Sequence, residues 1–150
     1  MYLIESIIQR FENDTDDNAL ALQALLPIGH MISEFDKSDL PEPYCILKEG
    51  ETTMLSSGTN YAYRVEKTPI IFWVVTKSTG SDISGKQQCY DIVEAIDNAY
   101  QTTCLNDIGS RVVIGAPEFE ARTPIERNGN NLDNWECKIA FSFQQQKSFA

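Results

Sequence analysis

The sequence predicts an α+β fold: a mostly antiparallel mixed sheet with an amphipathic helix packed on one face, plus N-terminal helices. Three observations predict it. The hydrophobic period changes from strand to helix within residues 70–101, a strictly alternating strand lies near the C-terminus, and an apolar stripe at helical spacing opens the chain. At 150 residues we expect a single domain, 1–150. Its expected segments are N-terminal helices (1–36), strands and a hairpin (44–76), a central helix (84–101) and a C-terminal hairpin (110–145).

The pattern of the first 43 residues predicts helices followed by an extended connector. One stripe predicts an amphipathic helix over residues 2–12, made of Leu3, Ile4, Ile7, Ile8 and Phe11. Residues 19–26 are rich in helix formers, and Pro27 and Gly29 separate them from a second apolar group that ends at Phe35. This pattern predicts a broken helix or a helical pair. Residues 36–43 contain two prolines and predict an extended connector, with the sheet beginning after it.

The next segment predicts strands. Residues 44–54, with a polar centre at 48–51, predict a short hairpin. Residues 61–66 alternate and predict a half-exposed strand, and Pro69 marks a bulge or an edge because it cannot donate to a ladder. The unbroken apolar run Ile70–Val75 predicts a strand covered on both faces.

A helix over residues 85–100 follows a polar turn at 79–85, where Asp82 or Ser84 can cap the first free amides. The apolar positions recur at steps of three and four residues, and they are Cys89, Ile92, Val93, Ile96, Ala99 and Tyr100. This stripe is expected to pack on the sheet.

The C-terminal part predicts two further strands joined through a hairpin. Residues 111–121 form a strand that Pro117 disturbs, and Asn128–Gly129 is a strong hairpin signal. In the last strand one face carries Trp135, Cys137, Ile139, Phe141 and Phe143, and the other carries Glu136, Lys138, Ala140, Ser142 and Gln144. Such alternation indicates one packed face and one face exposed to water or to a lumen.

The formal net charge of −10 opposes phosphate-backbone binding as a primary activity, since that activity needs clustered Lys and Arg. No apolar run has the length of a membrane span, and the N-terminus lacks the pattern of a signal peptide. We therefore expect a cytoplasmic setting and no membrane partner.

Residues 80–86 match the G-x-x-x-x-G-K core of a phosphate-binding loop between a strand and a helix. Gln87 stands where a Ser or Thr hydroxyl would bind Mg²⁺, and Asp82 would place a carboxylate close to the phosphates. A polar turn with a good helix start is the favoured interpretation.

The sequence predicts no cofactor and no metal site. The four cysteines, Cys45, Cys89, Cys104 and Cys137, form no C-x-x-C pair, and they are interpreted as core residues or free thiols. His30 is the only histidine. Residues 12–18 resemble the start of a calcium loop but lack its glycine and its final glutamate.

An enzyme remains an alternative through a metal surrounded by four carboxylates, Asp91, Glu94, Asp97 and Asp107. Helical spacing places the first three of these residues on an ordinary solvated face.

The order of elements resembles the tail terminator, or tail completion, proteins of long-tailed bacteriophages. The closest points are Pro43–Tyr44, the polar segment 48–53, residues 63–75, the helix 85–100 and residues 122–143. Residues 14–35 look like an elaboration beyond the single first helix of that family.

The resemblance implies a virion protein and not an enzyme. Its members close into a homo-oligomeric ring, commonly of six, at the head-proximal end of the tail tube. The ring stops tube growth and joins the tail to the head. The implied partners are the tail tube protein and a head-completion or connector protein, with DNA only passing through the lumen. The implied location is the tail–neck junction of a virion assembled in the host cytoplasm.

Two alternatives remain open beside the enzyme. The chain is either another neck or tail tube component of the particle, or a small cytosolic adaptor that binds one partner through a sheet edge. For a ring, we expect Arg122, Glu126 and Arg127 to form intersubunit ion pairs, with Glu136 and Ser142 facing the lumen. Solvated loop charges are the alternative interpretation of the first three.

Overall fold

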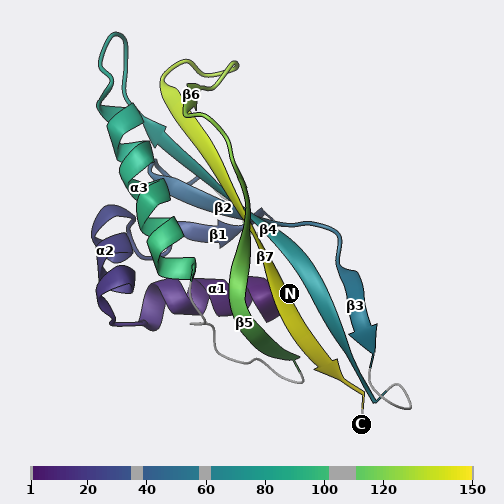
Figure 1. Cartoon of the computed structure of the whole chain (residues 1–150). Helices are drawn as coiled ribbons and strands as arrows, with labels where there is room; N and C mark the ends of the chain where they lie inside the picture. Colours follow the sequence, from purple (N-terminus) through teal and green to yellow (C-terminus); the bar gives the residue numbers. More distant parts are fainter. Residues whose placement is uncertain (1, 35–38, 58–61, 102–110, 150) are drawn as a thin grey trace.

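The computed structural model describes residues 2–34, 39–57, 62–101 and 111–149 and has the predicted α+β fold (Figure 1). A seven-stranded sheet has the order β1-β2-β4-β7-β5, with β3 added to β4 and β6 added to β7. β1 is parallel to β2, and the other pairs are antiparallel. The sheet is therefore mixed and mostly antiparallel, as predicted.

The two longest strands form the centre of the molecule. β4 (Tyr63–Lys77) pairs with β7 (Asn134–Ser148) along their whole lengths, from Tyr63 opposite Ser148 to Lys77 opposite Asn134. β5 (Arg111–Arg122) and the short β6 (Glu126–Arg127) cover the outer edge of β7. β5 contains two irregularities, the first between Ile114 and Glu118, where Gly115 has φ 65°. The predicted interruption near Pro117 is confirmed.

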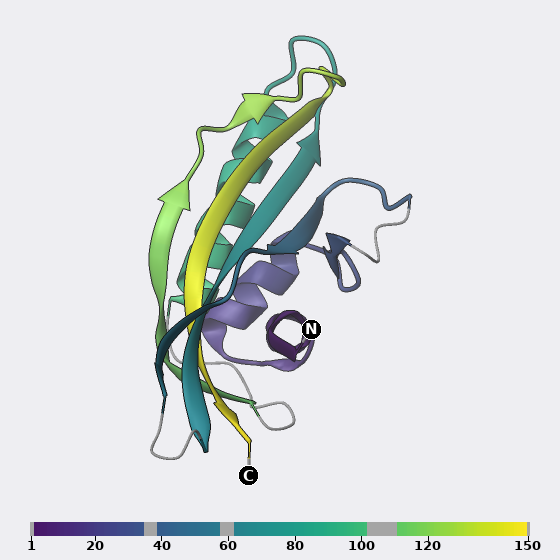
Figure 2. The same cartoon turned by 90° about the vertical axis from the view of Figure 1, so that its right-hand side faces the viewer.

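The described helices lie on one side of the sheet (Figure 2), and they are α1 (Tyr2–Asn13), α2 (Asp17–Leu25) and α3 (Ser84–Tyr100). The predicted stripe of α3 is confirmed, since Ile92, Val93 and Ile96 are fully buried. Each such aliphatic side chain stabilises the fold by roughly 1.5–3 kcal/mol. Tyr100 joins three elements, because its ring lies 5.0 Å from that of Phe72 and its hydroxyl donates to the Ile7 carbonyl at 2.7 Å.

The expected helix after Pro27 is wrong, because β1 (Met31–Ser33) takes its place, and the sheet therefore begins before the 36–43 connector. Pro27 and Gly29, with φ 88°, end the helical path. Met31 and Ser33 are then buried alternately with the half-buried Ile32, which is the period of a strand. Phe35 lies outside the described residues.

The expected hairpin over residues 44–54 is also wrong. β2 (Tyr44–Glu49) and β3 (Thr53–Ser57) do not pair with each other but run one after the other along β4. Residues 50–52 lie opposite residues 68–69, which inserts one extra residue, and the Gly50 amide donates to the Pro69 carbonyl at 2.8 Å. The bulge expected at Pro69 is thus confirmed. Because Pro69 lies opposite this bulge, its lack of a backbone N–H leaves no ladder partner unpaired.

The expected coverage of the Ile70–Val75 run on both faces is only partly confirmed. Ile70, Phe72 and Val74 are buried under the helices, whereas on the other side Val75 is buried but Ile71 and Trp73 are only half-buried. The helices fill one side only, so alternate residues of the run lie at a face without a helix among the described residues.

Candidate assembly surfaces

The face of the sheet opposite the helices, here called the open face, is adapted to water. At its centre Trp73 lies between two lysines, with the Nζ atoms of Lys48 and Lys138 each 5.2 Å from the ring centroid. The Trp73 Nε1–H donates to Glu136 Oε2 at 3.2 Å. Long lysine stems cover apolar surface while their ammonium groups stay in solvent. The open face therefore keeps its large aromatic residue partly covered without a helix.

Part of the negative charge on the open face is paired with a lysine. Lys67 forms ion pairs with Glu118 at 3.1 Å and with Glu120 at 3.4 Å. A hydrogen bond with Ser142, and then the charge of Lys67, lower the pKa of Glu120. One lysine thus offsets part of the negative charge of two glutamates on this part of the face.

The two residues expected at a lumen both lie on the open face, but with different exposure. Glu136 is half-buried and accepts hydrogen bonds from Trp73 and from Asn128 Nδ2 at 3.0 Å. Ser142 is only 4% exposed and lies opposite Pro69 in the register of β4 and β7. Ser142 is therefore largely covered within the chain itself.

Of the three charged residues expected at an interface, Arg122 ends β5 and Glu126 and Arg127 form β6. Arg122 forms an ion pair with Glu94 of α3 and lies 5.4 Å from the Tyr90 ring. Glu126 is exposed and lies opposite Glu136 in the β6–β7 register. The structure thus assigns Arg122 a partner in its own chain, in addition to the partner expected in a neighbour.

Arg127 holds two loops together. Its guanidinium donates to the Gly80 carbonyl at 2.8 Å and to the Leu132 carbonyl, and it stacks 4.3 Å from the centroid of the Trp135 ring. The 79–83 turn is thereby tied to the tip of the β6–β7 hairpin, whose connection runs from Asn128 to Asp133 (Figure 1, top).

The resemblance to a phosphate loop has a packing explanation. A Cβ atom on Gly85 would lie 2.8 Å from both Ser78 Oγ and Trp135 Cδ1, so glycine is needed for the close approach of α3 to the sheet. The Asp82 carboxylate accepts hydrogen bonds from the Ser84 amide and hydroxyl, which also lowers the pKa of Asp82. An acidic side chain therefore occupies the position that a phosphate would need.

Two of the carboxylates considered for a metal bind other side chains of the chain. Asp91 accepts from Gln87, Glu94 pairs with Arg122, and burial followed by the charge of Glu94 raises the pKa of Asp97. Asp107 lies outside the described residues. Within the described part of the chain no group of three or more His, Cys, Asp or Glu side chains is arranged to hold a metal ion.

Three cysteines, Cys45, Cys89 and Cys137, are buried free thiols, and Cys104 lies outside the described residues. Burial raises the pKa of each of these three thiols. The Nδ1 atom of His30 lies 2.8 Å from the Pro43 carbonyl oxygen, which fits a packed histidine.

The structure contains a buried arginine that the sequence did not predict. Arg10 is 4% exposed, pairs with Asp14 and Asp16, and donates from Nη2 to the Ala99 carbonyl at 3.0 Å. It thus joins α1 to the C-terminal end of α3 and offsets part of the negative charge of the turn that resembled a calcium loop. Its i, i+4 spacing from Asp14 was the available signal.

Among the described residues, exposed apolar side chains lie on the edge strand β3, at the start of α3 and along α2, besides the open face. Met54 and Leu55 of the edge strand β3 are 64% and 50% exposed, and β3 lies at the opposite end of the molecule from the β6–β7 tip (Figure 1). Ile83 and Tyr90, at the start of α3, are 65% and 47% exposed. No described helix is long and apolar enough to span a bilayer.

No protein-family model matches the chain, and no curated protein matches it in sequence. The fold does match a chain in the solved virion of a native gene transfer agent (GTA) particle, with a TM-score of 0.67 and 14% sequence identity. The match covers 97% of this chain and 95% of the other. The two chains therefore share one fold over nearly their whole lengths.

Proposed function

We propose that this chain is a structural subunit of a phage-like virion and acts as a tail terminator. In this proposal, copies close into a ring, commonly of six, at the head-proximal end of the tail tube. The ring stops tube growth and joins the tail to the head. The observation that carries the proposal is the fold shared with a chain of a gene transfer agent virion over nearly the full length of both.

The open face supports the placement of a lumen. DNA must pass through such a lumen without being held, so its wall needs polar groups but no uncompensated cluster of cations. The ammonium groups of Lys48 and Lys138 beside Trp73 supply polar groups, and Lys67 is compensated by Glu118 and Glu120. Glu136 would face the lumen, whereas the small exposure of Ser142 makes it part of the wall's support.

The subunit contacts in this proposal are heterologous, so that one surface of each copy meets a different surface of the next. Arg122, Glu126 and Arg127 lie at the edge that such a contact would use. Because Arg122 and Arg127 already bind groups of their own chain, their effect on the ring would be partly through holding the β5–β6 edge in shape.

The partners would be the tail tube protein on one side and a head-completion or connector protein on the other, at the tail–neck junction. The test is to assemble the parent particle without this chain and image the products. Tails of excess and variable length, with unattached filled heads, are expected, and supplying the protein should restore joined particles. Normal tails joined to heads in its absence would contradict the proposal.

A small adaptor that binds one partner is the second candidate, and the exposed edge strand β3 favours it. β3 pairs on one side with β4, and Met54 and Leu55 are exposed there. An adaptor would remain monomeric in solution, so the mass of the purified protein distinguishes the two candidates.

A further inference from the structure

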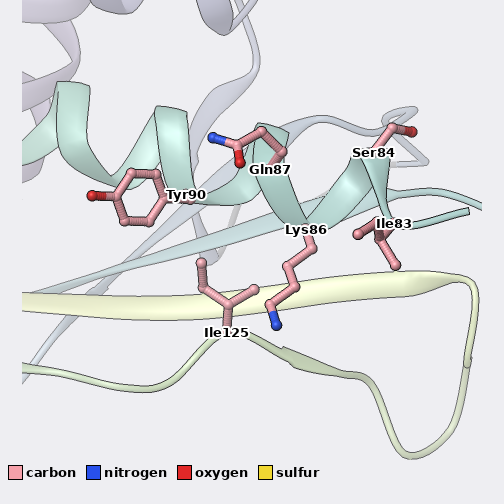
Figure 3. A pocket seen from close by; sticks show the side chains of 6 residues that line it. All are labelled: Ile83, Ser84, Lys86, Gln87, Tyr90 and Ile125. Carbon is pink, nitrogen blue, oxygen red and sulfur yellow. The ribbon is translucent and has the colours of Figure 1, made fainter.

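A groove lies between the first turns of α3 and the connection from β5 to β6. It has a volume of about 390 Å³ and is lined by Ile83, Ser84, Lys86, Gln87, Tyr90 and Ile125, here called the α3 groove (Figure 3). The side chains of Lys86 and Ile125 extend from opposite walls toward the same space (Figure 3). The groove thus offers apolar contacts beside an ammonium group.

Lys86 is the charged residue of the α3 groove. It is exposed, its Nζ lies 5.8 Å from the Trp135 centroid, and none of the carboxylates in the described ranges forms an ion pair with it. Arg122, next to Tyr90, is already neutralised by Glu94. An occupant that fits would therefore carry apolar side chains and at least one carboxylate.

The outer face of α2 has this chemistry. Asp17, Leu20, Ala21 and Ala24 are exposed at spacings of three, four and seven residues, which places them on one face of the helix. Leu20 is 47% exposed, and Ile28, just beyond the helix, is 56% exposed. An acidic helix start is thus followed by an apolar surface.

We propose that the α3 groove of one copy receives the outer face of α2 from the next copy, with Asp17 of that copy near Lys86. α2 packs against α3 in its own chain, and in Figure 1 it lies on the opposite side of α3 from β5 and β6. The two surfaces are therefore distinct, so each copy can use its α3 groove for one neighbour and its α2 for the other, as a ring requires. This inference rests on the proposed ring and names its contact.

Photo-crosslinking tests the contact directly. Tyr90 is replaced by p-benzoylphenylalanine, and the variant is assembled into rings. The rings are irradiated, and crosslinked peptides are identified by mass spectrometry. The inference predicts that position 90 crosslinks to residues 17–28 of another copy. A ring whose crosslinks map to a different segment, or to none, overturns the inference and leaves the proposed function intact.

A charge swap tests the same contact by affinity. Lys86→Glu and Asp17→Lys should each raise the dissociation constant of the ring about fivefold, and the double variant should return to within about twofold of wild type. Leu20→Asp should raise it at least about 30-fold, since it places a carboxylate in an apolar contact. Lys77→Glu, which reverses an exposed lysine outside the groove, is the matched control and should leave the ring unchanged.

The outcomes separate the two proposals. Charge reversals that weaken the ring without recovery in the double variant, or a Leu20→Asp ring as stable as wild type, contradict the contact between the groove and α2. Circular dichroism shows whether each variant is folded, and Lys86 and Asp17 are exposed, so both singles should fold. A wild-type protein that forms no ring contradicts the proposed function itself.

Discussion

Replacing Gly85 by alanine tests the packing explanation of the G-x-x-x-x-G-K segment. Helix propensity alone would favour the change by up to about 1 kcal/mol, because alanine is the better helix former. The structure predicts the opposite sign. The added Cβ would lie 2.8 Å from Ser78 Oγ, 2.8 Å from Trp135 Cδ1 and 2.9 Å from the Lys77 carbonyl carbon.

The magnitude follows from these three contacts. Overpacking a methyl group against surroundings that must move costs about 1–3 kcal/mol. Movement of Ser78 or Trp135 would also weaken the hydrogen bond from Trp135 Nε1 to Ser78 Oγ, which is 3.0 Å long and worth about 0.5–1.5 kcal/mol. After the gain in propensity, Gly85→Ala should lower the free energy of unfolding by about 1–3 kcal/mol.

Urea unfolding followed by far-UV circular dichroism and by tryptophan fluorescence measures this loss. Gly129→Ala is the control, because a Cβ at Gly129 meets nothing within 4 Å, and it should change stability by less than about 0.5 kcal/mol. If Gly85→Ala is as stable as the wild type or more stable, the close approach of α3 to the sheet is refuted.

Three further predictions concern the core and the buried charges. Ile96→Asp should unfold or insolubilise the protein because it buries a carboxylate under the sheet. Glu94→Ala loses one half-exposed ion pair and should lower the free energy of unfolding by at most about 1 kcal/mol. Soluble yield and melting temperature measure both variants, and equal tolerance would contradict the assignment of the α3 stripe. The hydrogen bond from Arg10 lowers the pKa of Asp16 in the folded chain below its ordinary 3.8, so stability from this pair is present above that pH and is lost as pH falls. Acid titration of the melting temperature should therefore show a smaller loss below about pH 4 for Asp16→Asn than for wild type, and identical profiles would count against the pair. Cys45 should resist iodoacetamide in the native protein and react in urea, because it is fully buried and its pKa is raised; rapid native labelling, read by mass spectrometry, would contradict its position.

Local periodicity was sufficient to predict α3 and β7. Both are long, and their burial follows a 3.6- or 2-residue repeat through residues such as Ile92 and Phe141. β1 could not be predicted in the same way. Its three residues, Met31 to Ser33, are too short for a period, and their strand conformation depends on parallel pairing with β2, a contact between distant segments.

The sequence pattern also did not predict which strands pair with each other. The polar residues around Gly50 suggested a reversal of the chain, but a one-residue bulge opposite Pro69 accommodates them without reversal. For the candidate surfaces, charge alone did not show that Arg127 binds the carbonyl groups of Gly80 and Leu132. Backbone acceptors leave no mark in a sequence, so the contacts of this arginine needed the fold.

Negative-stain imaging of the purified wild-type protein, alone and mixed with tail tubes of the parent particle, tests the proposed function most directly. The proposal predicts closed rings, commonly of six copies, with one ring at the end of each terminated tube. A protein that remains monomeric beside bare tail tubes would contradict it.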